Sequence, residues 1–311
     1  MINREFGRRT FMKRAGQAGS LLAVGGALES LLAACGGNVS TTPVAVSPGA
    51  TTIPNAGLKI PGQMQWGADF NGGGPYVFKD PAHPNGAAIG FEVEIAAAMA
   101  SLLRVSPVQV QTDYGELEAA LMANHFDFIM NGWEKTADRE KTELFSDPYY
   151  VYSQQIVVRK NDPRFANYNE TSNVSLRLLE NLVVGTGTGY KAVDDMKTDP
   201  KVIVKTYDGN LPFDDLKQKK IDAMMVDAPI IIYYVVGKGL GAQPDPEIKL
   251  LGKPIFQDNY YIGFNKQNSN APTLLKEVNQ AFDVLKKNGT LRTIYEKWSM
   301  WDEHQKDIGI V

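Results

Sequence analysis

A glutamate and an arginine, Glu134 and Arg139, share one short connection of the chain, the segment NGWEKTADREK at 131–141. The connection follows an apolar run, residues 126–130, that has the length of a buried strand. A planar guanidinium can donate two parallel hydrogen bonds to a carboxylate, and a carboxylate can accept bonds from an ammonium group. We therefore hypothesise that the two charges receive the two charged ends of one small molecule.

Other chemistries find little support in the residue pattern. The three histidines, His83, His125 and His304, lie far apart and give no metal-ligand spacing. No Ser-His-Asp or Cys-His arrangement is readable. The net charge of −3 does not suggest a nucleic-acid partner, and 43% hydrophobic with 22% charged residues is ordinary globular composition. We expect no metal, no cofactor and no nucleic acid.

Two segments that position such residues share one local plan. Residues 117–132 and 216–227 each read as a helix with a leucine at its start, an apolar-Asp pair and a short strand. A helix signal follows each strand: Thr136 can cap the first helix, and Asp227 with Pro229 opens the second. The repeat predicts two α/β lobes. Ligands of open α/β sheets bind beyond the carboxyl ends of strands, so the charged residues after both strands would face a cleft between the lobes.

Residues 90–103, GFEVEIAAAMASLL, predict a strand end that runs into a helix with an apolar stripe. This stretch resembles the signature of the polar amino acid family of extracellular solute-binding proteins, the binding components of ABC importers. Further segments follow in the order and spacing of that family across residues 64–300. They are Gly67-Ala68-Asp69, Pro75-Tyr76, Asp113-Tyr114, the segment 131–141, residues 145–150, residues 184–189, residues 222–227, residues 261–264 and residues 289–298.

The resemblance implies a periplasmic-binding-protein-like type II fold, in which two α/β lobes are joined by a two-strand hinge with the ligand cleft between them. We expect residues 60–152 and 260–311 to form lobe 1 and residues 153–259 to form lobe 2, with the crossings near 151–154 and 258–262.

The resemblance also implies a head-group site. Arg139 matches the arginine that clamps the ligand's α-carboxylate, and Asp227 matches the acid that takes the α-ammonium. Glu134 stands where many relatives carry Ser, Thr or Asp, so it could share that ammonium. Carbonyl groups after the first strand and backbone N–H groups at a helix start in lobe 2 would complete the head-group site, through Asn131, Gly132, Thr188, Gly189 and Tyr190.

For the ligand side chain, the resemblance implies contacts with Asp69 and Tyr114, and aromatic walls from Tyr76 and Trp133. Residues 72–74, GGG, stand where relatives often have an aromatic residue, which leaves one wall open. The excess of carboxylates over arginine favours a basic or amide amino acid, the carboxylates being Asp69, Glu134 and Asp227.

Each assignment has an alternative in which the residue has no ligand role. Arg139 could be a solvated charge, Glu134 could pair with a surface lysine, and Asp227 could only cap a helix. Asp69 could bond to turn amides. The aromatic residues Tyr76, Tyr114 and Trp133 could belong to the core.

The predicted function is capture of a polar, basic or amide amino acid and its delivery to the membrane permease of an ABC importer, by a monomer that is not an enzyme. Two alternatives use the same fold. One is an exported enzyme like cyclohexadienyl dehydratase, with Glu134 transferring a proton. The other is an amino-acid-sensing module that signals to a receptor.

The N-terminus predicts export and attachment. Residues 1–35 combine an arginine pair, Arg8-Arg9, with an apolar stretch and Leu-Ala-Ala-Cys, which resembles a twin-arginine signal followed by a lipoprotein box. Cys35 would then carry the lipid. Residues 36–59 are rich in Gly, Ser, Thr and Pro and predict a flexible tether. We expect an extracytoplasmic protein, in the periplasm or on the outer face of the cell membrane, held there by its lipid.

Overall fold

The structure is a computed structural model that describes residues 52–209 and 211–311. These residues form two main β-sheets and a small two-stranded one, β2 (Phe78–Lys79) with β3 (Ala88–Ile89). Within the described part of the chain, no helix has both the length and the apolar character needed to cross a membrane. The predicted export signal 1–35 and its Cys35 lie outside the described residues.

The first main sheet has the strand order β4-β1-β5-β13-β6. Its strands are β1 (Gln63–Ala68), β4 (Ser106–Gln111), β5 (Phe128–Ile129), β6 (Glu143–Phe145) and β13 (Gly263–Asn265). Strand β1 pairs in parallel with β4 and β5, whereas β13 pairs antiparallel with β5 and β6. The sheet therefore combines early segments of the chain with a late one.

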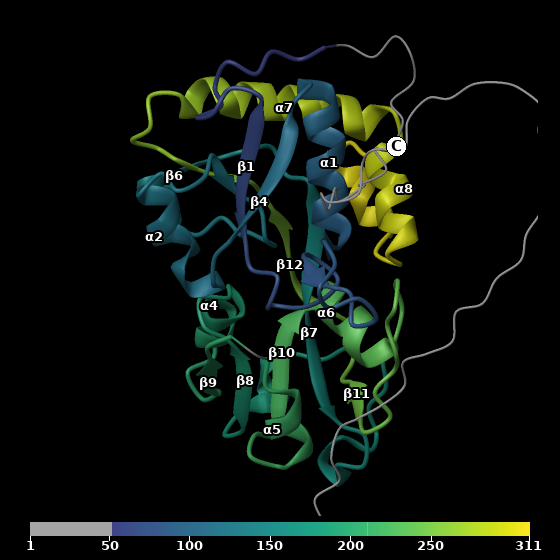
Figure 1. The fold of residues 1–311 in the computed structure, drawn as a ribbon. Helices are drawn as coiled ribbons and strands as arrows, with labels where there is room; N and C mark the ends of the chain where they lie inside the picture. The colour runs from purple at the N-terminus through teal and green to yellow at the C-terminus, as the bar shows by residue number, and fades with distance from the viewer. Residues whose placement is uncertain (1–51, 210) are drawn as a thin grey trace, which may run out of the picture. The chain divides into compact units, whose positions relative to one another are not determined.

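Three helices pack together beside this sheet: α1 (Phe91–Leu103), α7 (Ala271–Lys287) and α8 (Thr290–Lys297) (Figure 1). Helix α1 carries two acids in its first turn, where the helix dipole favours negative charge. Helix α7 has a proline at its start and two lysines in its last turn. Helix α7 buries an apolar stripe, as an amphipathic helix does. In α1, nine of the 13 residues are buried and only Ser101 is exposed, so its buried face is wider than the stripe predicted from the sequence.

The second main sheet has the order β11-β7-β10-β8-β9, and β12 also pairs with β7. Its strands are β7 (Tyr150–Arg159), β8 (Val183–Gly187), β9 (Ile203–Tyr207), β10 (Ala223–Asp227), β11 (Ile248–Leu250) and β12 (Ile255–Tyr260). Strands β10, β8 and β9 run parallel, while β7 is antiparallel to β10. The residues after the parallel strands therefore meet at one edge.

Short helices connect the strands, and the predicted helix–strand–helix plan occurs twice, as α2–β5–α3 and as α5–β10–α6. Of the strand predicted at 126–130, only β5 (Phe128–Ile129) forms strand pairing in the sheet. Bounds of the short elements are α2 (Leu117–Met122), α3 (Arg139–Thr142), α4 (Ala192–Lys197), α5 (Phe213–Lys217), α6 (Ala228–Ile231), the π-helix η4 (Ile232–Val236), and the 3-10 turns η1 (Tyr114–Glu116), η2 (Pro163–Phe165), η3 (Leu176–Leu179) and η5 (Glu303–Ile308).

Strands β7 and β12 lie side by side and antiparallel at the two expected crossings. Tyr150 pairs with Tyr260 and Gln154 with Ile255, and the register shifts between Ile255 and Asp258. The ring of Tyr152 stacks on that of Tyr260, with centroids 4.2 Å apart. Two adjacent strands with stacked rings can bend together, which suits a hinge.

Residues 52–59 differ from the predicted tether. Ile53 and Leu58 are buried, and the backbone N–H groups of Ala56 and Gly57 donate to the carboxylate of Glu277 on α7. Apolar burial and these hydrogen bonds fix the segment against the first lobe, so the Gly, Ser and Pro content misled the sequence interpretation here. The remainder of the predicted tether lies outside the described residues.

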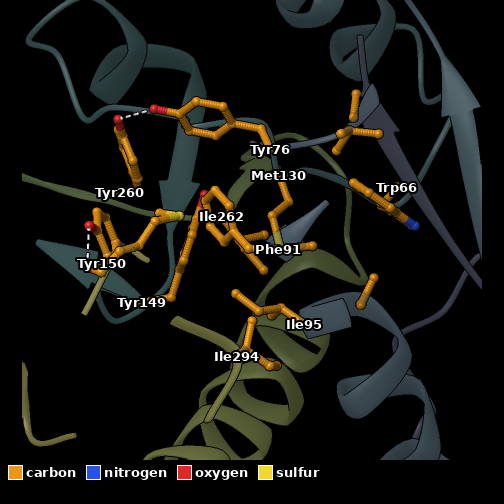
Figure 2. Packing of buried hydrophobic residues seen from close by; sticks show 14 of the residues in the cluster. Trp66, Tyr76, Phe91, Ile95, Met130, Tyr149, Tyr150, Tyr260, Ile262 and Ile294 are labelled. Carbon is orange, nitrogen blue, oxygen red and sulfur yellow. Dashed lines mark hydrogen bonds between the residues drawn. The ribbon is translucent and has the colours of Figure 1, made fainter. Parts of the chain in front are cut away.

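Aromatic residues form much of the core where β7 and β12 meet α1 and α8. Tyr149, Tyr150, Tyr260 and Phe91 are each almost fully buried, and Figure 2 shows them gathered together with Tyr76. The hydroxyl groups of Tyr76 and Tyr260 are hydrogen-bonded at 2.6 Å. Buried tyrosine needs a partner for its hydroxyl, so this core carries polar contacts to the cavity described next.

Candidate functional site

A cavity of about 820 Å³ lies where the loops after β1, β5, β8, β9 and β10 converge. Its lining residues are Asp69, Asn71, Gly72, Gly73, Tyr76, Asp113, Tyr114, Gly115, Glu116, Asn131, Gly132, Glu134, Gly187, Thr188, Tyr190, Tyr207, Asp208, Gly209, Asp227 and Ile230. They come from both main sheets, so the cavity has the position that a cleft between two α/β lobes would have. Its volume suits a small molecule.

Most of the predicted site residues line this cavity, namely Asp69, Tyr76, Tyr114, Asn131, Gly132, Glu134, Thr188, Tyr190 and Asp227. Three others are not among the lining residues: Trp133, Arg139 and Gly189. Trp133 and Arg139 are 2% and 7% exposed. Gly189 has φ of 79°, a backbone angle that favours glycine, and turns its carbonyl oxygen toward Arg139.

Both terminal nitrogens of Arg139 donate to protein groups. Its Nη1 donates to the backbone oxygen of Glu134 at 2.9 Å and to the Glu134 carboxylate at 3.1 Å. Its Nη2 donates to the Gly189 oxygen at 3.2 Å, across the cleft. The guanidinium carbon lies 3.4 Å from the centre of the Trp133 ring, a close cation–π contact. Arg139 is therefore a buried, paired cation and not a solvated surface charge.

Glu134 is 1% exposed and has partners on both sides of the cleft. Its Oε2 accepts from Arg139 and from the Tyr114 hydroxyl, each at 3.1 Å, and its Oε1 accepts from the Lys191 backbone N–H at 3.4 Å. The surface-lysine alternative is wrong, because Lys135 and Lys141 pair with Glu140 and Asp138. Burial raises the pKa of Glu134, and the charge and hydrogen bond of Arg139 oppose that rise.

Asp227 begins helix α6 but its carboxylate does not cap it. One carboxylate oxygen accepts from Gln154 Nε2 at 2.8 Å, and the other accepts from the Tyr260 hydroxyl at 2.5 Å. Burial and then the nearby Glu134 charge raise the pKa of Asp227 well above its usual range, against the effect of those two hydrogen bonds. The site therefore holds a carboxyl group that gains from a nearby cation.

Asp69 supports the loops of the first lobe. Its carboxylate accepts from the backbone N–H groups of Asn71 and Tyr114 and from the Gln111 amide. This is the turn-bonding alternative raised by the sequence, although Asp69 also lines the cavity. Its own N–H donates to the side-chain oxygen of Asn131 at 2.8 Å. These bonds hold two lining loops, after β1 and after β5, in one arrangement.

Tyrosines from the second lobe fill the space beside residues 72–74. A Cβ on Gly73 would lie 2.1 Å from the Tyr234 hydroxyl, and one on Gly74 would lie 2.6 Å from the Tyr233 ring. The Tyr234 hydroxyl accepts from the Gly74 N–H at 2.8 Å. Because the glycines have no Cβ, η4 of the other lobe can pack against them. Its tyrosines provide the aromatic side chains that the sequence did not predict at this wall of the cavity.

Sequence reasoning missed Gln154 and Tyr260, which hold the Asp227 carboxylate from the hinge strands. A signal was present, because Ser153, Gln154 and Gln155 interrupt the apolar residues of β7, and Gln154 is 0% exposed. It also missed the acids of the cavity rim, Asp113, Glu116 and Asp208, whose surface positions gave no sign of convergence.

The cavity is strongly acidic. Its described lining includes no lysine, arginine or histidine, and its carboxylates are Asp69, Asp113, Glu116, Glu134, Asp208 and Asp227. The ammonium of Lys191 points elsewhere, to Asp195 at 2.7 Å and Asp258 at 3.3 Å. Within the described residues, no cluster of three or more His, Cys, Asp or Glu side chains is arranged to hold a metal ion. The electrostatics favour an organic cation or a zwitterion with extra positive charge.

The chain is similar to proteins of a known family. The model of the bacterial extracellular solute-binding proteins, family 3, matches residues 72–300. The probable amino-acid-binding protein YxeM of Bacillus subtilis (strain 168) is 27% identical over 227 residues, which cover 72% of this chain and 79% of that protein. Residues 72–300 include the second main sheet, the first one apart from β1, and all the cavity-lining residues except Asp69 and Asn71.

Solved structures of related proteins have the same fold as this chain. An ancestral arginine-binding protein bound to glutamine is 30% identical, with a TM-score of 0.65, and the match covers 78% of this chain and 100% of that one. An ancestral amino acid-binding protein described as a precursor of cyclohexadienyl dehydratase is 28% identical, with a TM-score of 0.63 and coverage of 76% and 95%. The predicted two-lobe, type II α/β fold is confirmed.

Proposed function

Because the chain belongs to family 3 of the bacterial extracellular solute-binding proteins, we propose that it captures a basic or amide amino acid in the interlobe cavity. The relatives described above are named for amino acids, and one solved relative, named for arginine, holds glutamine. The single observation that carries the choice of a cationic or amide ligand is the acidic lining of the cavity, which has carboxylates and no basic side chain among its described residues.

Capture follows from differential contacts between the lobes. Asp227 and Glu134 are buried carboxylates that face the cavity from opposite lobes, and a ligand ammonium between them pairs both. A ligand that bridges the lobes stabilises the state in which they are together, since it has no second partner when they separate. The closed protein then delivers the ligand to the permease subunits of an ABC importer and acts as a monomer.

The α-carboxylate of the ligand is assigned to Arg139, whose guanidinium lies beside Glu134. It reaches that guanidinium only when the Glu134 side chain turns away, because Arg139 does not line the cavity. The backbone N–H groups of Thr188 and Tyr190 donate to the backbone oxygens of Tyr207 and Gly187. Of the N–H groups at 188–190, we therefore assign only that of Gly189 to the ligand carboxylate. Tyr76, Tyr114 and Tyr190 contribute aromatic surface for the ligand side chain.

A thermal-shift screen of the twenty amino acids, followed by calorimetry, tests this function. A ligand that binds only the folded protein raises its stability, so arginine, lysine or glutamine is expected to raise the melting temperature. An acidic amino acid as the best ligand, or no amino acid at all, would contradict the proposal.

In this proposal the protein binds its ligand and does not catalyse a reaction. Relatives that are mainly binding proteins support this, while the likeness to a dehydratase precursor gives the enzyme alternative a direct assay. Incubation with prephenate-like cyclohexadienyl acids is expected to yield no product. The sensing alternative is distinguished by genes for a permease and an ATPase beside this one.

We also assign export and lipid attachment to the N-terminal residues, on the sequence pattern around Arg8-Arg9 and Cys35. Mass spectrometry of the protein from its own membrane is expected to find a diacylglyceryl group on Cys35. A Cys35→Ala variant is expected to appear in the soluble fraction, and unchanged membrane retention would contradict the assignment.

A further inference from the structure

The residue expected to hold the ligand's carboxylate already holds a carboxylate of the protein. Arg139 bonds to both the backbone oxygen and the side chain of Glu134, and its other terminal nitrogen bonds to Gly189. Glu134 in turn accepts from the Lys191 N–H, one of the backbone donors of the second lobe. Glu134 therefore occupies the place that an α-carboxylate would take between guanidinium and helix start.

This pairing changes what the pocket demands of a ligand. A buried guanidinium without a partner is costly, so a site that keeps such a group for the ligand rejects analogues that lack the carboxylate. Here the guanidinium is stacked on Trp133 and neutralised by Glu134 before any ligand arrives. The ligand need bring no negative charge.

The rest of the cavity points the same way. Beyond the Glu134–Arg139 pair, its described lining retains Asp69, Asp113, Glu116, Asp208 and Asp227 without a basic side chain. A zwitterion places its own carboxylate in this negative field, whereas a cationic amine does not. Both the internal ion pair and the remaining charge thus favour ligands with a positive and uncompensated head group.

We propose that Glu134 serves as a built-in substitute for the ligand's carboxylate, so that the cavity also takes organic amines that lack one, such as α-carboxamides and decarboxylated amines of basic amino acids. This inference rests on the proposed function for the position of the site, and it extends the ligand class from amino acids to cationic amines. Glu134 is in this view a specificity-determining residue.

The test compares matched pairs by calorimetry with the full chain: L-arginine with L-argininamide and agmatine, L-lysine with L-lysinamide and cadaverine, and L-glutamine with its α-carboxamide. In the wild-type protein, each amine is expected to bind within about tenfold of its parent amino acid or more tightly. In Glu134→Ser and Glu134→Gln, which free the guanidinium, preference for the parent is expected to rise by about 100-fold.

The control variant is Glu116→Gln, which removes one negative charge from the same cavity at an exposed position that is not part of the Glu134–Arg139 pair. It is expected to leave the amine-to-parent ratio within about threefold of wild type, because it leaves the pair intact. An equal change of ratio in Glu116→Gln and Glu134→Gln would assign the effect to net charge and overturn the role of Glu134.

The outcomes separate the two proposals. If a wild-type parent amino acid binds and its carboxamide and amine do not, the inference is overturned and the proposed function stands. If only the amines bind, the inference stands and the amino-acid function is replaced. If no member of any pair binds, both fail. Thermal unfolding of each variant shows whether it is folded, and a Glu134→Asp variant gives a second, smaller change should Glu134→Ser not fold.

Discussion

Single residues decide the electrostatics of the cavity, and their partners differ from those that residue type alone suggests. Asp227 is placed at a helix start, yet the hinge residues Gln154 and Tyr260 hold its carboxylate. Asp69 is held by turn amides, and Glu134 is held by an arginine from its own loop. Each carboxylate is oriented by neighbours, and of the three only Glu134 has to move, when a ligand carboxylate takes its place at Arg139.

The raised pKa of Asp227 predicts pH-dependent binding of a cation. A cationic ligand prefers the ionised carboxyl group, so affinity should strengthen as pH rises from the usual carboxyl range toward the raised pKa of the empty site, and binding should release a proton. Calorimetry in buffers of different ionisation enthalpy measures both effects.

Asp227→Asn keeps the shape and removes the titrating group. We expect it to weaken binding by about 2 to 5 kcal/mol at neutral pH and to abolish the proton release. An unchanged pH profile in this variant would show that another group, such as Glu134, holds the proton.

At the scale of elements, buried acids tie helices to the loops that line the cavity. Glu92, in the first turn of α1, is fully buried and accepts from the Gly132 N–H at 2.7 Å and from the Tyr149 hydroxyl at 2.5 Å. This contact fixes the loop after β5, where Gly132 has φ of 58°. Gly132 is followed at once by the residues that hold Arg139, so α1 sets the position of the head-group loop.

Burial raises the pKa of Glu92 to about 7, against the hydrogen bonds from Tyr149 and Gly132. The folded protein thus binds a proton that the unfolded chain has lost above its ordinary carboxyl pKa. The contribution of Glu92 to the free energy of unfolding is therefore fully present below that ordinary pKa, and it is lost as pH rises to about 7.

Glu92→Gln should remove this part of the decline, which we expect to be on the order of 3 kcal/mol in the free energy of unfolding between acid and neutral pH. Urea unfolding at a series of pH values measures it, with the exposed Glu116→Gln as the charge-matched control. A slope identical to that of the wild type would show that Glu92 does not titrate in this range.

At the scale of the whole molecule, hydrogen bonds and ring contacts join loops of the two lobes across the cavity. Arg139 reaches Gly189, Glu134 reaches Lys191, and Gly74 donates to Tyr234. Of these three contacts, the hydrogen bond from Gly74 to Tyr234 is the one that lies away from the charged head-group site. It therefore offers a way to change closure without changing the cavity's charge.

Tyr234→Phe removes the hydroxyl that accepts from Gly74 and should favour the separated lobes. We expect a larger radius of gyration without ligand, a normal one with ligand, and affinity weakened by about 1 kcal/mol. Small-angle scattering with calorimetry measures this. Tyr233→Phe is the control, since its hydroxyl donates to Leu240 in the same lobe. Equal effects of both variants would mean that ring packing, not the hydrogen bond, controls closure.

The lobe boundaries predicted from the sequence, 60–152 with 260–311 and 153–259, stay a prediction, although β7 and β12 pair where the crossings were expected. Residues 52–59 show why such limits are hard to read. Their composition is that of a linker, but Ile53 and Leu58 find a surface on the first lobe. Whether a short apolar residue is buried depends on a surface formed by distant segments.

The sequence by itself determined the family and the repeated helix–strand–helix plan, because apolar periodicity and the signature at 90–103 depend on neighbours in the chain. It also predicted nine of the 20 residues that line the cavity, since strand ends in such folds converge at one edge. Only the tertiary structure decided the partners of the charges. Arg139 meets Glu134 and Gly189, and Asp227 meets Gln154 and Tyr260, because distances between side chains depend on how the two lobes pack, which no local pattern encodes.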